Sequence, residues 1–269
     1  IFPTLGNSER PDIVAAKILE GRVAILCDGT PFVLTAPYLF IETLLFNEDY
    51  YTRWLFGTLV RFLRTSSLII TTTLPAFYLA LVTFHHDVIP FKLLLTITAS
   101  REGIPFSAFI ETLFMGFTFE LLREAGVRMP RPVGQAVSIV GALVLGQAAV
   151  EAGIASNPVV MITAITAITS FTISPLREAI PFLRVALLIA ANILGLMGIS
   201  LLITIIIIHM CSLRSFGIPY LAPFSPLKGM DIKDTLIRFP LWSMWTRPMS
   251  LNKGKNIHRM QKDIKTKED

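Results

Sequence analysis

The chain has 269 residues, of which 53% are hydrophobic and only 16% are charged, whereas soluble domains carry roughly 25% charged residues. This balance excludes an ordinary soluble domain as the whole chain and favours an integral membrane protein. The net charge of +5 is spread unevenly: from His209 onward eleven Lys and Arg face five Asp and Glu, whereas residues 1–64 hold six against seven. A basic C-terminal tail is typical of a cytoplasmic membrane face.

Residues 1–52 are expected to be water-soluble. The stretch Ser8–Asp12 resembles a helix start, because Pro11 lies in what would be the first turn. The apolar runs Val23–Cys27 and Phe32–Leu34 flank an Asp-Gly pair, which favours a β-hairpin because both central residues tolerate positive φ. Since two strands alone are marginally stable, we expect this hairpin to be the edge of a larger domain that lies further upstream.

Four segments are predicted to cross a membrane, because a helix needs about 20 apolar residues to cross a hydrocarbon core of about 30 Å. They are Thr65–Phe84, Val133–Gly153, Pro158–Ser174 and Phe182–Ile208. Pro75 interrupts the first segment, where it would kink the helix or mark a packing irregularity. Arg184 lies near one end of the fourth segment, where we expect its guanidinium to snorkel to the surface.

Residues 104–122 are apolar over most of a helix surface, but Glu111 and Glu120 interrupt them. Nine residues separate the two carboxylates, so they lie on nearly opposite faces at about 100° per residue. A helix lying flat on a membrane would keep its charges on one side. We therefore expect a helix buried among others, interfacial or re-entrant, with a fifth span as the alternative.

The predicted fold class is an all-α polytopic membrane protein with about four transmembrane helices, one interfacial or re-entrant helix and a short α+β remnant of a soluble N-terminal domain. Its parts are the soluble remnant at 1–52, the transmembrane helical domain at 53–208 and a basic cytoplasmic tail at 209–269. Basic residues before the first span and in the tail place both termini in the cytoplasm. This placement requires an even number of spans.

Four polar side chains within the apolar segments are candidates for an ion path or a subunit interface. They are Glu111, Glu120, Gln147 and Glu151. Ionisable groups at membrane depth are costly and are commonly functional. Glu151 follows Gln147 by one helical turn, so both project from the same face. The alternative for Glu151 is an interfacial place, where it reaches the headgroup region.

Other residues are expected to act structurally. Gly146 and Gly153 belong to pairs of small residues four apart, which let membrane helices approach closely. Arg101 and Glu102 precede a Gly-Ile-Pro turn and suit a loop or a helix start, because adjacent residues on a helix do not face each other. Pro75 has the structural role named above.

No motif for catalysis, nucleotide binding or metal binding is present, so we expect neither an enzyme nor a cofactor. His85, His86 and Asp87 are consecutive and cannot converge on one ion without unusual backbone, so they are interpreted as a solvated loop end. Cys27 and Cys211 lack metal-type spacing, which excludes a zinc site and argues against a disulfide. The basic tail lacks interleaved aromatic residues, which favours a membrane surface or disorder over nucleic acid.

Nine stretches of the chain match the pattern of one family, in the family's order. They are Glu9–Lys17, Glu20–Ile25, Asp28–Val33, Leu93–Thr96, Arg101–Pro105, Phe119–Gly126, Arg131–Ala136, Gly146–Gly153 and Cys211–Gly217. The chain therefore resembles the A-subunit family of spore germination receptors, the GerA family, over roughly residues 9 to 223.

The resemblance implies a subunit of a nutrient receptor in the inner membrane of a dormant bacterial spore. Such receptors pair an A subunit with a permease-like B subunit and a lipoprotein C subunit, and nutrient sensing leads to cation release and germination. The resemblance also implies that A subunits form homo-oligomers and act as the ion-conducting element. In this family the B subunit is the better candidate for holding the nutrient.

Two departures from the family pattern bear on this expectation. The large soluble N-terminal domain of the family is largely absent, so we expect an N-terminally truncated member, and the link Ser174–Pro181 is shorter than usual. A truncated or inactive paralogue, or a member of a sporulation-specific branch, is therefore an alternative. A secondary transporter and a non-conducting scaffold are further alternatives, although no internal repeat supports a transporter.

Overall fold

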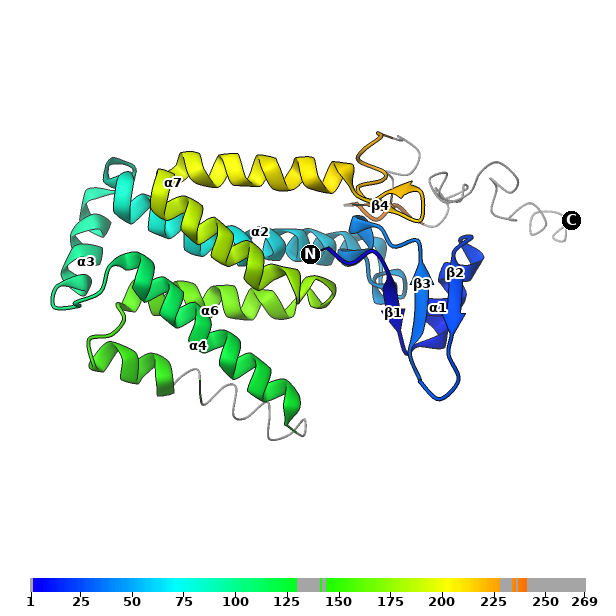
Figure 1. Cartoon of the computed structure of the whole chain (residues 1–269), viewed down its shortest axis with the longest axis horizontal. Coiled ribbons are helices and arrows are strands. Elements are labelled where there is room, and N and C mark those ends of the chain that lie inside the picture. The colour runs from blue at the N-terminus through cyan, green and yellow to red at the C-terminus, as the bar shows by residue number, and fades with distance from the viewer. Residues whose placement is uncertain (1, 130–140, 142–143, 228–233, 236, 241–269) are drawn as a thin grey trace, which may run out of the picture. The chain divides into compact units, whose positions relative to one another are not determined.

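A computed structural model describes residues 2–129, 141, 144–227, 234–235 and 237–240 (Figure 1). The described part is mostly helical, with a few short strands. It divides into two compact units, one of residues 1–66 and 206–269 and the other of residues 67–205. Helices α2 (Trp54–Phe84) and α7 (Ala179–Ser212) each run from one unit into the other.

The first unit contains the predicted helix and hairpin. Helix α1 spans Pro11–Leu19 with proline in its first turn, where the missing N–H leaves no helical carbonyl unpaired. Strands β2 (Val23–Leu26) and β3 (Val33–Ala36) pair antiparallel, which confirms the hairpin. Strand β1 (Gly6–Ser8), which was not predicted, pairs with the other edge of β3, so the sheet order is β1-β3-β2.

The turn of this hairpin differs from a two-residue Asp-Gly turn. The last paired residues are Leu26 and Val33, so residues 27–32 form the connection. In this connection only Gly29 has a positive φ, of 85°. The Asp28 carboxylate instead accepts a hydrogen bond from the Gly29 N–H at 3.1 Å. The longer loop removes the need for positive φ at both central residues.

A small core of aromatic and apolar side chains completes the first unit. The remaining elements of the first unit are the 3-10 helices η1 (Phe40–Thr43) and η2 (Asn47–Tyr50) and the strands β4 (Arg214–Ser215) and β5 (Ile218–Pro219). Tyr38, Met210 and Tyr220 are buried together. Burial raises the pKa of both tyrosine hydroxyls above their usual range, so both stay protonated at physiological pH.

The second unit consists of helices held by two apolar clusters. Besides parts of α2 and α7 its elements are η3 (His86–Val88), α3 (Phe91–Arg101), α4 (Ala108–Arg128), a helical stretch at 144–151, α6 (Asn157–Phe171) and η4 (Ser174–Leu176). One cluster includes Leu79 of α2 and Leu188 of α7. The other includes Met115 of α4 and Val159 of α6.

Two described helices, α2 and α7, are long and apolar enough to cross a membrane. Helix α2 contains the predicted segment Thr65–Phe84 and begins earlier, at Trp54. Helix α6 has 15 residues and a length of about 22 Å, which is less than the roughly 30 Å of a hydrocarbon core. Of the predicted span Val133–Gly153, residues 133–140 and 142–143 lie outside the described residues. Candidate helices of full length are therefore described for two of the four predicted spans.

Gly195 divides α7 into two helical segments, 179–194 and 196–212, which meet at an angle in Figure 1. Its φ of 61° and ψ of −139° are non-helical and suit only a residue without a Cβ. A Cβ there would lie 2.9 Å from His85 Cε1 and 3.2 Å from Phe84 Cβ. The predicted single span Phe182–Ile208 is thus divided between two segments of about 24 and 26 Å.

Candidate functional site

Glu111 lies inside the helical unit with only 1% of its surface exposed. It projects from the first turn of α4 toward the start of α6, where Ser156 is the N-cap. One carboxylate oxygen accepts the Ser156 backbone N–H at 2.6 Å and also the Ser156 hydroxyl. The positive end of the α6 dipole favours a carboxylate at this place. Glu111 therefore fastens α4 to the start of α6.

Arg101 and Tyr78 complete this arrangement, which we call the Glu111 cluster (Tyr78, Arg101, Glu111 and Ser156). The Arg101 Nε lies 3.6 Å from the second Glu111 oxygen, which is beyond hydrogen-bond distance. Among the described residues, that oxygen, the Arg101 Nε and the Tyr78 hydroxyl have no hydrogen-bond partner. The cluster joins α2, α3, α4 and α6 at one enclosed polar point.

A second cluster lies nine residues further along α4. Glu120 pairs with Arg123 of its own helix at 2.5 Å and with Arg184 of α7 at 3.3 Å. The Arg184 Nε donates to the backbone carbonyl of Thr71 in α2 at 3.3 Å. The Thr71 hydroxyl donates to Thr169 of α6 at 2.7 Å. These five residues, the Glu120 cluster, tie four helices together.

The prediction that Arg184 snorkels to the surface is wrong. Its side chain is buried, with 4% of the residue exposed. The physical reason is that two acceptors inside the unit, the Glu120 carboxylate and the Thr71 carbonyl, lie within its reach. Glu120 itself keeps 22% of its side chain exposed. The Glu120 cluster is therefore less enclosed than the Glu111 cluster.

Gln147 and Glu151 both lie on the exposed side of the helical stretch 144–151, whereas Gly146 and Ala149 are buried. This agrees with the predicted shared face. Within the described ranges the structure gives neither polar side chain an ion pair. A polar face on an apolar helix suits a second chain or an aqueous path better than lipid.

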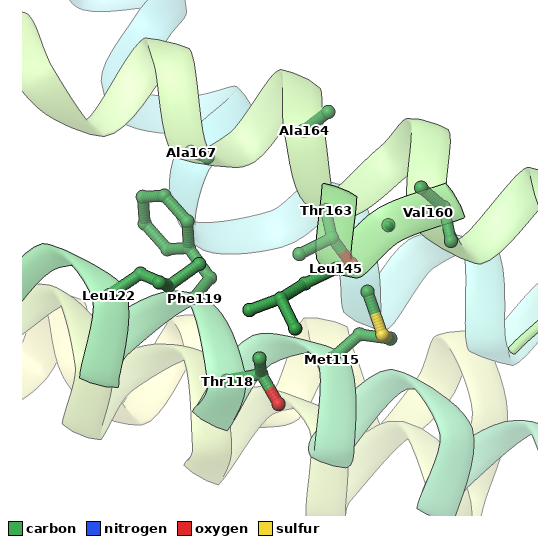
Figure 2. Close-up of a pocket in the computed structure, with 10 residues that line it drawn as sticks. Met115, Thr118, Phe119, Leu122, Leu145, Val160, Thr163, Ala164 and Ala167 are labelled. Carbon is green, nitrogen blue, oxygen red and sulfur yellow. The ribbon is translucent and has the colours of Figure 1, made fainter. Parts of the chain in front are cut away.

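Gly146 allows the stretch 144–151 to pack closely on α6, because a Cβ at this position would lie 3.2 Å from Val160 Cγ1. Beside this contact a small cavity of about 60 Å³ lies between α4, the stretch and α6 (Figure 2). Its lining is mainly apolar, with Thr118 and Thr163 as the polar side chains. Ligand pockets have volumes of about 300 Å³ or more, so this cavity is too small for an ordinary ligand.

Gly153 has a different role from the close packing that its spacing suggested. Its φ is 65°, and a Cβ there would meet nothing within 4 Å. The N–H groups of Gly153 and Ile154 donate to the carbonyls of Val150 and Ala149. This is the glycine turn that commonly ends a helix.

The remaining predicted site residues lie at helix interiors and ends. Helix α2 continues through Pro75. Helix α3 ends at Arg101, with Glu102 as its exposed C-cap, so this pair lies at a helix end and not at a start. In the part of the chain that the structure describes, no group of three His, Cys, Asp or Glu suits a metal ion.

A third charged cluster, which was not predicted, lies in the first unit near the start of α2. Buried Asp49 accepts hydrogen bonds from Arg61 Nε at 3.4 Å and Arg64 Nη1 at 3.0 Å. Asp234 accepts from Arg61 Nη1 at 2.8 Å and from the Tyr50 hydroxyl at 2.6 Å. Burial, with the Asp234 charge as a smaller cause, raises the pKa of Tyr50. Arg61 and Arg64, which are among the basic residues before the first predicted span, thus also have a structural role.

The signals for the missed partners were partly present in the sequence. Ser156 precedes Asn157 and a proline, which is a recognisable helix start. Its bond to Glu111, 45 residues away, has no sequence signal. The same holds for Thr71 and Arg184, which are 113 residues apart. Long-range side-chain pairing accounts for most of what was missed.

The chain is similar to known proteins along most of its length. A family model described as Bacillus/Clostridium GerA spore germination protein matches residues 1–250. The uncharacterized membrane protein YfkQ of Bacillus subtilis (strain 168) is 50% identical over 255 residues, which cover 94% of this chain and 50% of that protein. Spore germination protein KA of the same strain is 49% identical over 260 residues, 96% of this chain and 48% of that protein.

Spore germination protein GerLA of Bacillus cereus is 47% identical over 249 residues, which cover 92% of this chain and 51% of that protein. The chain thus spans about half the length of the curated relatives it matches. No solved structure matches it.

Proposed function

Because the chain belongs to the GerA family of spore germination proteins, we propose that it is a membrane subunit of a spore nutrient receptor. The family match over residues 1–250 is the observation that carries this proposal. In this role the chain contributes to nutrient-triggered cation release and has no catalytic activity. Its partners are a permease-like B subunit, a lipoprotein C subunit and further copies of itself.

The proposed location is the spore inner membrane, with several spans and both termini in the cytoplasm. Helices α2 and α7, which are long and apolar enough to cross a membrane, support this location. The basic residues before the first span and in the C-terminal tail support the cytoplasmic termini. The four-span topology includes the segment 133–153 and helix α6.

The proposed cation path uses the polar groups that remain accessible. Gln147 and Glu151 share the exposed face of the stretch 144–151, where a second copy of the chain would meet them, and Glu120 retains partial exposure. Glu111 supports the path without lining it, because its carboxylate is enclosed by Ser156 and Arg101. This assignment narrows the four predicted residues to three, with Glu111 as a structural group.

The test uses spores whose gene for this chain has been deleted. Nutrient-triggered cation release should be impaired and should return with the wild-type gene. Glu151→Gln should restore it only in part, because it removes the charge from the proposed path. Glu102→Gln is the matched control, since Glu102 is an exposed carboxylate in the C-cap of α3, and should restore release fully. Normal release without the gene would refute the receptor role.

A non-conducting scaffold is the second candidate. The short α6 and the break of α7 at Gly195 favour it, since they leave α2 as the unbroken helix of full span length in the described residues. A scaffold predicts that Glu151→Gln reduces co-purification of partner subunits. A conducting subunit predicts normal co-purification with reduced cation release.

A further inference from the structure

Pro75 leaves one carbonyl of α2 without its helical partner. In an α-helix each N–H bonds the carbonyl four residues earlier, and proline has no N–H. The carbonyl that lacks this donor belongs to Thr71, a residue with 0% exposure. A buried carbonyl without a hydrogen bond is destabilising, so the fold needs a donor from elsewhere.

Arg184 is that donor. Its Nε donates to the Thr71 carbonyl oxygen at 3.3 Å from the first segment of α7. Its Nη1 lies 3.3 Å from a Glu120 carboxylate oxygen. The guanidinium is therefore placed by a backbone carbonyl of α2 on one side and a carboxylate of α4 on the other. Within the described ranges its Nη2 has no hydrogen-bond partner, so the buried cation is only partly satisfied.

Glu120 has a second cation in Arg123, at 2.5 Å and on its own helix. Breaking a buried ion pair is normally costly, because one charge is left uncompensated. Here the carboxylate keeps Arg123 when Arg184 moves away. Arg123 Nη2 lies on Oε2 of the carboxylate and Arg184 Nη1 on Oε1, so the two arginines compete for its charge and not for one oxygen atom.

We propose that Thr71, Pro75, Glu120 and Arg184 form a latch that fixes the first segment of α7 (179–194) to α2 and α4. Pro75 provides the free carbonyl, Arg184 is the movable part, and Arg123 weakens the latch by competing for Glu120. The segment that the latch holds begins after η4 and ends at Gly195. The latch is a conformational device of the helical unit and does not depend on the proposed germination role.

Backbone hydrogen exchange across 179–194, measured by mass spectrometry on the full chain in lipid nanodiscs, tests the latch. Arg184→Gln should speed exchange of this segment by roughly tenfold, because an ion pair and a hydrogen bond are lost. Pro75→Ala should speed it by about fivefold, the worth of one hydrogen bond, since the restored N–H competes for the Thr71 carbonyl. Exchange in α1, which belongs to the other unit, is the internal reference.

The combination of the two changes is decisive. In the Arg184→Gln background, Pro75→Ala should not alter exchange of 179–194. The Thr71 carbonyl has then already lost the Arg184 donor, so restoring the helical N–H displaces nothing. Equal effects of Pro75→Ala in both backgrounds would overturn the coupling. Pro158→Ala is the matched control. Pro158 lies in the first turn of α6, where its missing N–H leaves no helical carbonyl free, so exchange of 179–194 should not change.

Arg123→Gln should change the exchange rate of 179–194 in the opposite direction. Without its competitor, Arg184 should hold Glu120 more tightly, and exchange of 179–194 should slow by about twofold to fivefold. If Arg123 merely contributed to a static charge network, its loss would speed exchange. Faster exchange in Arg123→Gln would therefore refute the competition, even if Arg184→Gln did not fold well enough to be measured.

Discussion

Two glutamates of helix α4, Glu111 and Glu120, are held in contrasting ways. Glu111 is enclosed, with 1% of its surface exposed. One of its oxygens accepts both the backbone N–H and the hydroxyl of Ser156, and the Arg101 Nε lies 3.6 Å from the other. Glu120 keeps 22% of its side chain exposed and divides its charge between two arginines, at 2.5 and 3.3 Å. One carboxylate is tied to a helix start, and the other is shared between two helices.

This contrast argues that a carboxylate within an apolar segment is not functional by its sequence position alone. Glu111 is held by Ser156 and lies beside Arg101, so moving it would leave buried donors and a cation unpaired. Glu120 can exchange one arginine for another at lower cost. The enclosed glutamate therefore suits a fixed structural role, and the shared one suits a site that changes state.

The largest effect is expected at the enclosed glutamate. Glu111→Gln should lower the free energy of unfolding by about 3 kcal/mol, because Arg101 loses its counter-charge inside the helical unit. Urea titration of the detergent-solubilised chain measures this change. Glu102→Gln, an exposed neighbour of Arg101, should leave the midpoint unchanged. If Glu111→Gln lowered the free energy of unfolding no more than Glu102→Gln does, the structural role of Glu111 would be refuted.

Asp49 sharpens the comparison, because it is enclosed like Glu111 but shared by two arginines like Glu120. If enclosure decides the cost, Asp49→Asn should lower the free energy of unfolding by roughly 2–3 kcal/mol, since Arg61 and Arg64 would be left buried beside a neutral amide. The same urea titration applies. If the free energy of unfolding fell by less than about 1 kcal/mol, the number of arginine partners, and not burial, would determine the destabilisation.

A smaller effect is expected at the shared glutamate. Glu120→Gln should lower the free energy of unfolding by about 1 kcal/mol, since an amide oxygen can still accept one hydrogen bond and the site is partly exposed. Glu120→Gln should also have a local effect: hydrogen exchange of 179–194 should become faster, whereas that of α3 should not change. Uniform acceleration through the helical unit would argue for general destabilisation.

The smallest effect on the isolated chain is expected at the exposed face. Glu151→Gln should change the free energy of unfolding by less than about 0.5 kcal/mol, as surface substitutions usually do. The chain purified in detergent as a monomer is the appropriate sample. A loss above about 1 kcal/mol in that sample would show that Glu151 is bound within its own chain.

Local patterns in the sequence predicted local structure well. Pro11 marked the start of α1, the Asp-Gly pair marked the hairpin, and the one-turn spacing placed Gln147 and Glu151 on one face. The nine-residue spacing also separated Glu111 from Glu120, which contact different neighbours. Such features depend on residues a few positions apart, which is the range over which periodicity and turn chemistry act.

Features that depend on distant residues were missed. Arg184 was predicted to snorkel because it lies near one end of its apolar segment, and its acceptors, Thr71 and Glu120, were missed because they are remote in sequence. The break at Gly195 was missed because a single glycine in an apolar run does not distinguish an intact helix from a divided one. The positive φ of Gly195 occurs where a Cβ would lie close to Phe84 and His85, which are remote in sequence.

The most direct test of the account is nutrient-triggered cation release from spores carrying Glu111→Gln, Glu120→Gln or Glu151→Gln in place of the wild-type chain. Release is divided by the amount of folded chain in the spore membrane, so that stability losses are removed. The account predicts wild-type release per folded chain for Glu111→Gln and reduced release for the other two. Reduced release for Glu111→Gln, with wild-type release for Glu120→Gln and Glu151→Gln, would contradict it.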